Sequence, residues 1–195
     1  MIYSLIIFLI LLPMKIFLTN ERLILREILP TDVEGMYELD SDPEVHKYLG
    51  NHPVKTKAES LELINYIRQQ YVEHGIGRWA IIDRKTNKFI GWTGLKYVTK
   101  ETNHHRNYYD LGYRLIKRFW GRGIASETAF ATLDYAFNTL NLSEVFAMAA
   151  RDNLASNRIL QNVGLQLKET FDMEGVSHNW YEIKNSEYWS KFGVK

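Results

Sequence analysis

Hydrophobic and polar residues follow the period of a β-strand over several stretches of the chain. Residues 22–29 alternate between apolar and polar, which predicts a strand in the edge region of a sheet. Short runs rich in aliphatic and aromatic residues predict further strands at 79–82, 89–98, 108–116 and 144–150. The strand at 108–116 is predicted to be buried, and 166–171 and 177–183 are predicted to form a closing hairpin.

Helical spacing fills the segments between these strands. After the buried strand, apolar residues recur three or four positions apart, at Ala125, Ala129, Leu133, Ala136 and Leu140. An amphipathic helix is predicted over 57–73, ended by Gly75 and Gly77, with an inward face that includes Leu61, Leu63, Ile64, Ile67 and Tyr71. The helix that follows 144–150 is predicted to bury Ala155, Ile159, Leu160 and Val163 and to end at a left-handed Gly164.

Shorter helical segments are predicted near the two ends of this pattern. The stretch 31–49 predicts two short helices broken near Asp42 and Pro43, with Thr31 as the N-cap of the first. A short terminal helix is predicted at 186–192.

Two glycines stand where the buried strand turns into a helix, in the pattern Arg118-x-x-Gly121-x-Gly123. Glycine lets the backbone adopt positive φ values and approach a ligand closely. The first helical turn then offers unpaired N–H groups and the positive end of the helix dipole, which suit a phosphate or pyrophosphate. The P-loop pattern and the dinucleotide-binding pattern both fail here, because Gly-Lys-Ser/Thr and the third glycine are missing. A tight turn that binds nothing is the alternative.

Composition narrows the class of protein. A chain of 195 residues suggests one domain with a single substantial core. The net charge of +1 gives no indication of a nucleic-acid or membrane partner. The chain has no cysteine, which excludes disulfides, thiolate metal sites and a cysteine nucleophile and is compatible with a reducing cytoplasm.

Residues 1–13 form an apolar N-terminal extension that ends at Pro13. The extension is shorter than the roughly 18–20 residues needed to span a bilayer, and it lacks the basic residues and cleavage site of a secretory signal. We expect an over-long start, with Met14 opening a single domain over 14–195; a short membrane anchor is the alternative. No stable membrane association is expected.

The segment from Leu111 to Leu115 and the segment from Trp120 to Ala129, with its two glycines, resemble the GNAT superfamily of N-acetyltransferases. They are most similar to the RimJ/RimL-like branch, which acetylates ribosomal-protein N-termini. Asn153-x-x-Ser156 followed by residues 162–165 is a second place of resemblance. The resemblance covers nearly everything from Met14 onward. It implies an α/β (α+β) fold with a mixed central sheet of about six to seven strands flanked by helices, in which the fourth and fifth strands splay apart.

The same resemblance implies acetyl-CoA as the co-substrate. Backbone groups of Leu115 and Ile116 would bond the pantetheine arm, together with Asn153 and Asn157. The pyrophosphate would be held by Arg118 and by the N–H groups of the glycine turn and first helical turn, namely Gly121, Arg122, Gly123, Ile124, Ala125 and Ser126.

Acetyl transfer to an amine needs a neutral amine, a stabilised carbonyl oxygen and a protonated thiolate leaving group. No Ser-His-Asp arrangement is evident, so direct attack without a covalent intermediate fits better. Several family members carry an acidic residue on this strand facing the acceptor, so the resemblance implies Asp110 as the candidate base, with a merely solvated carboxylate as the alternative. Many relatives use a tyrosine as the acid at the position of Leu160. Ser156 resembles the serine proposed for the ribosomal-protein branch and is the candidate acid, with helix capping as its alternative.

The sequence therefore predicts an acetyl-CoA-dependent N-acetyltransferase that acts on a protein N-terminus or a small primary amine. The alternative is a catalytically silent acyl-CoA-binding module, because the candidate catalytic residues are weakly specified. A cytoplasmic monomer or homodimer is expected, without nucleic acid. No metal site is expected, because His104 and His105 lack a third ligand at a recognisable spacing. These histidines are predicted to lie on a solvated loop at the mouth of the acceptor site.

Overall fold

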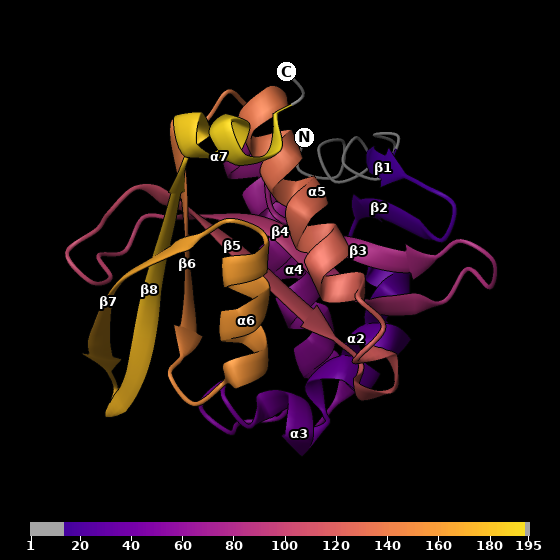
Figure 1. Ribbon diagram of the computed structural model, residues 1–195. Coiled ribbons are helices and arrows are strands. Elements are labelled where there is room, and N and C mark those ends of the chain that lie inside the picture. The colour runs from indigo at the N-terminus through magenta and orange to yellow at the C-terminus, as the bar shows by residue number, and fades with distance from the viewer. Residues whose placement is uncertain (1–13, 194–195) are drawn as a thin grey trace, which may run out of the picture.

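The computed structural model describes residues 14–193, so the predicted N-terminal extension lies outside the described residues. Within this range the chain forms an eight-stranded sheet in the order β1-β2-β3-β4-β5-β6-β8-β7 (Figure 1). Neighbouring strands are antiparallel except β5 and β6, which are parallel, so the sheet is mixed. The strands are β1 (Ile16–Thr19), β2 (Leu23–Glu27), β3 (Arg78–Asp83), β4 (Phe89–Val98), β5 (Tyr108–Leu115), β6 (Glu144–Ala150), β7 (Gln166–Met173) and β8 (Val176–Lys184).

Strands β5 and β6 separate soon after they meet. They pair at the register position Asp110↔Phe146, whereas β5 pairs with β4 along its whole length, from Tyr108↔Val98 to Leu115↔Gly91. Towards their carboxyl ends, the two parallel strands therefore diverge. This divergence confirms the splayed pair of strands and leaves a gap in the sheet between them.

Helices cover both faces of the sheet (Figure 1). Two helices, α5 (Ile124–Asn138) and α6 (Leu154–Asn162), lie on one face, where Leu111, Leu133 and Leu160 share a core. The opposite face is covered by α2 (Val33–Asp40) and α4 (Lys57–His74), and its core includes Met36 and Ile64. The remaining helical segments are η1 (Pro30–Asp32), α3 (Pro43–His46), η2 (Lys117–Phe119) and α7 (Asn185–Phe192). Between Met14 and Gly193, no helix combines the length and apolar character needed to cross a membrane.

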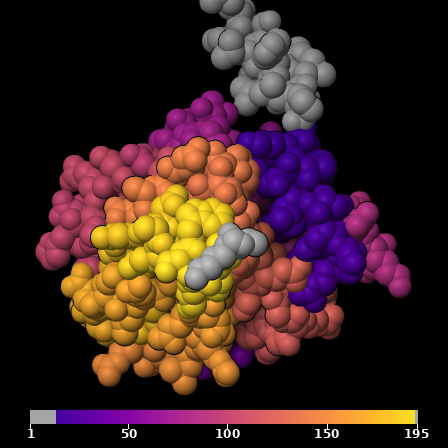
Figure 2. All heavy atoms as spheres, turned by 45° about the horizontal axis from the view of Figure 1, so that its top comes forward, coloured from indigo at the N-terminus to yellow at the C-terminus, as the bar shows by residue number. Residues whose placement is uncertain are grey.

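Most predicted elements are confirmed, including the break between α2 and α3, the closing hairpin and the terminal helix. Strand β1 was not predicted, because it has four residues and Ile16 is 52% exposed. It packs beside α5, as the indigo and orange atoms of Figure 2 show, with the Phe17 and Tyr135 rings 5.6 Å apart. Helix α5 ends before Leu140.

Three predicted local roles are wrong. Thr31 is not an N-cap: the cap of η1 is Leu29, whose N–H donates to the Asp32 carboxylate. Leu61 and Leu63 do not lie on the inward face of α4, since each is 38% exposed. The buried face of α4 instead carries Ser60, Ile64, Ile67 and Gln70, and Ala155 on α6 is also exposed. Apolar character alone did not identify the buried faces, because polar residues occupy part of the buried surface of α4.

Candidate active site

The glycine loop, residues 118–123, joins η2 to the start of α5. Gly121 and Gly123 both adopt left-handed backbone conformations, with φ of 70° and 74°. Space does not require glycine at position 121, since a Cβ there would meet nothing within 4 Å, so the backbone conformation is the reason. Gly123 is the N-cap of α5 and makes no side-chain cap bond. The N–H groups of the first turn therefore remain suited to an anion.

Cationic side chains surround this loop. The guanidinium carbons of Arg118 and Arg122 lie 4.8 and 5.4 Å from the centre of the Phe119 ring. Arg118 also pairs with Glu38 of α2, and Lys117 lies 3.7 Å from Glu44. A cleft of about 400 Å³ is lined by Glu38, Asp42, Ile116, Lys117 and Arg118. The structure thus brings Ile116 and Arg118, two predicted cofactor contacts, to one cleft.

Two hydrogen bonds hold the end of β5 to its neighbours, one between backbone groups and one from a side chain. The Ile116 N–H donates to the carbonyl of Ile90 at 3.0 Å, and the Trp120 indole donates to the carbonyl of Leu115 at 2.8 Å. These bonds hold both predicted pantetheine contacts beside the gap between β5 and β6, and they already engage the Ile116 N–H and the Leu115 carbonyl.

The start of α6 holds three predicted site residues in different ways. Asn153 is the N-cap, and its amide oxygen accepts the Ser156 N–H at 3.1 Å. Asn157 is buried, and its amide nitrogen donates to the carbonyls of Ala150 (2.9 Å) and Asn153 (2.8 Å). The Asn157 amide oxygen accepts bonds from Asn179 (2.8 Å) and Tyr181 (2.7 Å). Asn157 therefore fastens α6 to β6 and β8.

Ser156 faces a tyrosine that the sequence reasoning did not assign to the site. The Tyr113 hydroxyl, on β5, lies 3.1 Å from both the Ser156 hydroxyl and the Ser156 carbonyl oxygen. Burial raises the pKa of Tyr113, while its hydrogen bond with Ser156 opposes that shift. Two hydroxyls, one on β5 and one on α6, therefore meet, and the capping role belongs to Asn153. Leu160, at the position where relatives carry a tyrosine, is a core residue.

Asp110 is largely buried in an ion pair on the opposite face of β5. Its carboxylate pairs with the Arg78 guanidinium, which also donates to the Asp110 carbonyl at 2.7 Å and to the Gly94 carbonyl. The two side chains are 16% and 10% exposed, so Asp110 is not a solvated carboxylate. Burial raises the pKa of Asp110, and the charge and hydrogen bond of Arg78 oppose this. A Cβ on Gly112 would lie 2.7 Å from an Arg78 nitrogen, so glycine leaves room for the guanidinium.

A second ion pair extends this arrangement. The Arg114 guanidinium lies 2.5 Å from the Asp40 carboxylate. The Trp92 ring is flanked by both arginines, with the guanidinium carbons of Arg114 and Arg78 at 5.1 and 5.3 Å from its centre. His46 lies 3.6 Å from Asp40, and burial followed by the Arg114 charge lowers the pKa of His46. We call these six residues the polar row: His46, Asp40, Arg114, Trp92, Arg78 and Asp110.

Sequence reasoning identified only Asp110 in this row. Arg78 directly precedes a predicted apolar strand and Arg114 lies inside another. A charged residue at such a position indicates a buried ion pair, and this signal could have identified both arginines. His104 is exposed, and the His105 ring stacks on Trp180 with centres 5.0 Å apart, so only His104 fits the predicted solvated loop.

Comparisons to known proteins identify the family of this fold. The family model of the acetyltransferase (GNAT) domain matches residues 22–166. The uncharacterized N-acetyltransferase YoaA of Bacillus subtilis (strain 168) is 34% identical over 171 residues, covering 88% of this chain and 91% of that protein. The uncharacterized N-acetyltransferase p20 of Bacillus licheniformis is 32% identical over 167 residues, covering 86% of this chain and 88% of that protein.

Solved structures share the fold at lower identity. An acetyltransferase (GNAT family) from Bacillus anthracis matches with a TM-score of 0.74 at 23% identity, covering 88% of this chain and 99% of that one. Spermidine N-acetyltransferase from Vibrio cholerae, in complex with CoA and spermine, matches at 0.69 and 20% identity, covering 87% and 99%. Ribosomal-protein-S5-alanine acetyltransferase from Vibrio fischeri matches at 0.71 and 16% identity, covering 88% and 97%. The chain therefore belongs to the GNAT acetyltransferase family.

Proposed function

We propose that this chain transfers the acetyl group of acetyl-CoA to a primary amine by direct attack. The observation that carries the proposal is the gap between β5 and β6. The glycine loop and the Tyr113–Ser156 pair lie on the α5/α6 side of this gap, and the Asp110–Arg78 pair lies on the other. A thioester carbon held in the gap would meet an acid from one side and an amine from the other.

The residues at the gap fit acetyl-CoA. Gly121 and Gly123 adopt left-handed conformations, and Gly123, the N-cap of α5, has no side chain that could occupy the N–H groups. A pyrophosphate could therefore bind the N–H groups from Gly121 to Ser126. Arg118 and Arg122 supply positive charge beside it. In this proposal Arg118 leaves its ion pair with Glu38 and binds a phosphate of the cofactor instead. Leu115, Ile116 and Asn153 would line the pantetheine arm.

The proton-transfer roles follow from the two sides of the gap. Bound acetyl-CoA supplies a thioester carbon that a neutral amine attacks. Asp110 would take the amine proton as the N–C bond forms, directly or through one water. As the C–S bond breaks, the Ser156 hydroxyl would give its proton to the sulfur and take one from Tyr113. Tyr113 would regain its proton from water and Asp110 would release the amine proton to water as the products leave, so that the net proton passes from the amine to the thiol. Burial, which raises the Tyr113 pKa, keeps that hydroxyl protonated at neutral pH.

The proposed acceptor is a protein N-terminus or a small primary amine. The solved relatives that share this fold include enzymes named for spermidine and for a ribosomal protein, so the fold alone does not select an acceptor. We also propose that the enzyme works in the cytoplasm as a monomer or homodimer, with residues 14–195 as its single domain.

Release of free thiol from acetyl-CoA over a panel of polyamines, amino acids and N-terminal peptides tests the proposal. We expect turnover with at least one class of amine, and loss of most of that turnover in Asp110→Asn. Tight binding of acetyl-CoA without turnover on any acceptor would instead support the silent acyl-CoA-binding module. Mass spectrometry of acetylated amines in cells with and without the protein would then identify the acceptor.

A further inference from the structure

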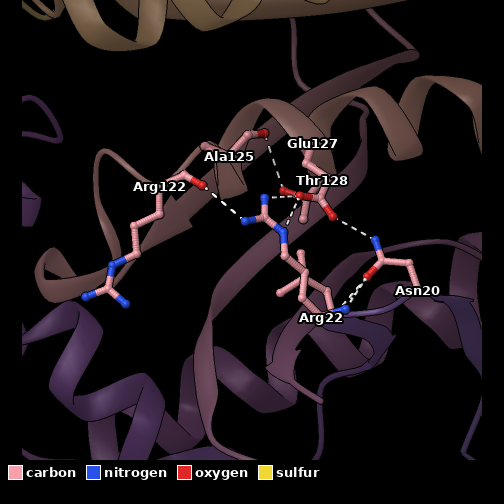
Figure 3. A network of polar contacts seen from close by, with 7 residues as sticks. Asn20, Arg22, Arg122, Ala125, Glu127 and Thr128 are labelled. Atoms are coloured by element: carbon pink, nitrogen blue, oxygen red, sulfur yellow. Dashed lines mark hydrogen bonds and ion pairs between the residues drawn. The ribbon is translucent and has the colours of Figure 1, made fainter. Parts of the chain in front are cut away.

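Side chains of the turn between β1 and β2, residues 20–22, form hydrogen bonds with the first helical turn of α5 (Figure 3). The Arg22 guanidinium binds the Glu127 carboxylate through two nitrogens, with its Nε at 2.7 Å. The Asn20 amide nitrogen donates to the other carboxylate oxygen at 2.7 Å. Asn20 is itself fixed, because its amide oxygen accepts the N–H groups of Arg22 (3.0 Å) and Leu23 (2.8 Å). Side chains of the β1–β2 turn and of α5, which are distant in the sequence, thus form one hydrogen-bond network next to the glycine loop.

The same guanidinium also holds the backbone of the loop. An Arg22 nitrogen donates to the carbonyl oxygen of Arg122 at 3.3 Å. In a planar trans peptide the C=O and the following N–H point in opposite directions. A bond that fixes the Arg122 carbonyl towards Arg22 therefore turns the Gly123 N–H away from Arg22. The Arg122 side chain also extends away from Arg22 in Figure 3.

The network also changes the charge at the start of α5. Glu127 places a negative charge in the first turn of the helix, close to the loop proposed to receive a pyrophosphate. Two like charges repel, and the repulsion is strongest when neither has a counter-charge. The hydrogen bond to Glu127 raises the pKa of Arg22, so the arginine is a permanent partner that offsets this carboxylate.

We propose that Arg22 is a positioning residue for the cofactor: it orients the Gly123 N–H and neutralises Glu127, so that the glycine loop presents donors and positive potential to a pyrophosphate. This inference rests on the proposed function, which makes the loop the pyrophosphate seat. Arg22 acts through the loop and does not contact the reacting atoms.

The test compares two acetyl donors that differ in the pyrophosphate. With acetyl-CoA, Arg22→Ala should raise the KM roughly three- to tenfold with kcat unchanged, as expected for one lost charged hydrogen-bond network at a half-exposed site. With S-acetyl-pantetheine, which has no pyrophosphate, kcat/KM should not change. Calorimetric titration with CoA should show the same loss of affinity, and Arg22→Lys should recover part of it by restoring the charge.

Arg84→Ala is the matched control. Arg84 donates to the Asn20 carbonyl at 2.7 Å and so supports the same turn, but it makes no bond to Glu127 or Arg122 among the hydrogen bonds of residues 14–193. Wild-type affinity for CoA in Arg84→Ala supports the inference. Equal losses with both donors, or an equal loss in Arg84→Ala, would show that Arg22 only stabilises the turn.

CoA binding by the wild-type protein separates the positioning role of Arg22 from the proposed function. If the wild-type protein binds CoA and Arg22→Ala binds it equally well, the positioning role is overturned and the proposed function stands. If the wild-type protein binds no CoA, the proposed function is overturned, and this inference falls with it.

Discussion

The glycine loop and the polar row, on opposite sides of the gap between β5 and β6, are built in different ways. The loop is a contiguous stretch whose proposed binding groups are backbone N–H groups and exposed arginines, and Arg118 is 47% exposed. The polar row is assembled from α2, α3, β3, β4 and β5, and its charged side chains are mostly buried. A site made from backbone depends on local conformation, whereas a site made from buried side chains depends on every partner being in place.

This difference predicts different responses to substitution. Buried charges lose hydration and depend on their counter-charges, so removing one partner affects both the stability and the chemistry of the row. The loop is exposed and already hydrated, so changes there should affect cofactor affinity with a smaller effect on folding. The following variants test that contrast.

The largest expected effect is on turnover in Asp110→Asn. Removing a general base lowers turnover about 10²–10⁴-fold, while affinity for acetyl-CoA should stay the same. Because burial raises the pKa of Asp110, the acidic limb of the wild-type rate profile should lie above the usual aspartate pKa of about 3.9. That limb should disappear in the variant.

Asp40→Asn is the control for Asp110→Asn, since it removes the other carboxylate of the polar row. Both variants leave an arginine without its counter-charge and should unfold more easily. Thermal unfolding is therefore measured beside the kinetics, at temperatures where both proteins are folded. If Asp40→Asn also removes the acidic limb, that limb does not report Asp110.

Gly123→Val should weaken acetyl-CoA binding about tenfold or more. A left-handed conformation costs a residue with a side chain about 1–2 kcal/mol, so the loop would leave the conformation that presents its N–H groups. Gly175→Val is a matched control, because Gly175 has a φ of 78° and lies in the β7–β8 turn, away from the loop. Calorimetry should show a loss of acetyl-CoA affinity for Gly123→Val only. If Gly123→Val binds acetyl-CoA as tightly as Gly175→Val does, the glycine loop is not part of the cofactor site.

Ser156→Ala and Tyr113→Phe should lower turnover by similar factors, and the double variant by less than the product of the two, because the hydroxyls act as one relay. Stability separates this role from capping. Asn153→Ala removes the cap of α6 and should cost about 0.5–2 kcal/mol of unfolding free energy, and Ser156→Ala should cost less. Near-normal turnover in both hydroxyl variants would mean that water carries the protons and that catalysis rests on positioning.

The smallest expected effect is a pH dependence of stability that comes from His46. Burial lowers the His46 pKa, with Arg114 and His52 adding to this and Asp40 opposing it. Below the usual histidine pKa of about 6.5 the unfolded chain therefore binds more protons than the folded one. The unfolding free energy should fall as pH decreases from 7, levelling off below the folded-state pKa. Denaturant unfolding of His46→Gln at several pH values should show a shallower slope; an unchanged slope would assign the effect to other groups.

The secondary structure was largely predictable from local patterns. Periodic and short apolar patterns located β2 to β8 and the longer helices, because each element buries its own apolar residues. The glycine loop was predictable for a related reason. Its proposed function depends on backbone conformation within a few consecutive residues, and glycine at a position indicates that conformation directly in the sequence.

The polar row and the hydroxyl pair were decided only by the tertiary structure. Arg114 and Asp40 are 74 positions apart, Tyr113 and Ser156 are 43 apart, and Arg78 and Asp110 are 32 apart. No local period links such pairs, and neither member alone shows whether it is buried or solvated. The register of β3, β4 and β5 and the packing of α2 and α6 set those distances, and the distances in turn set the burial and the pKa of each group.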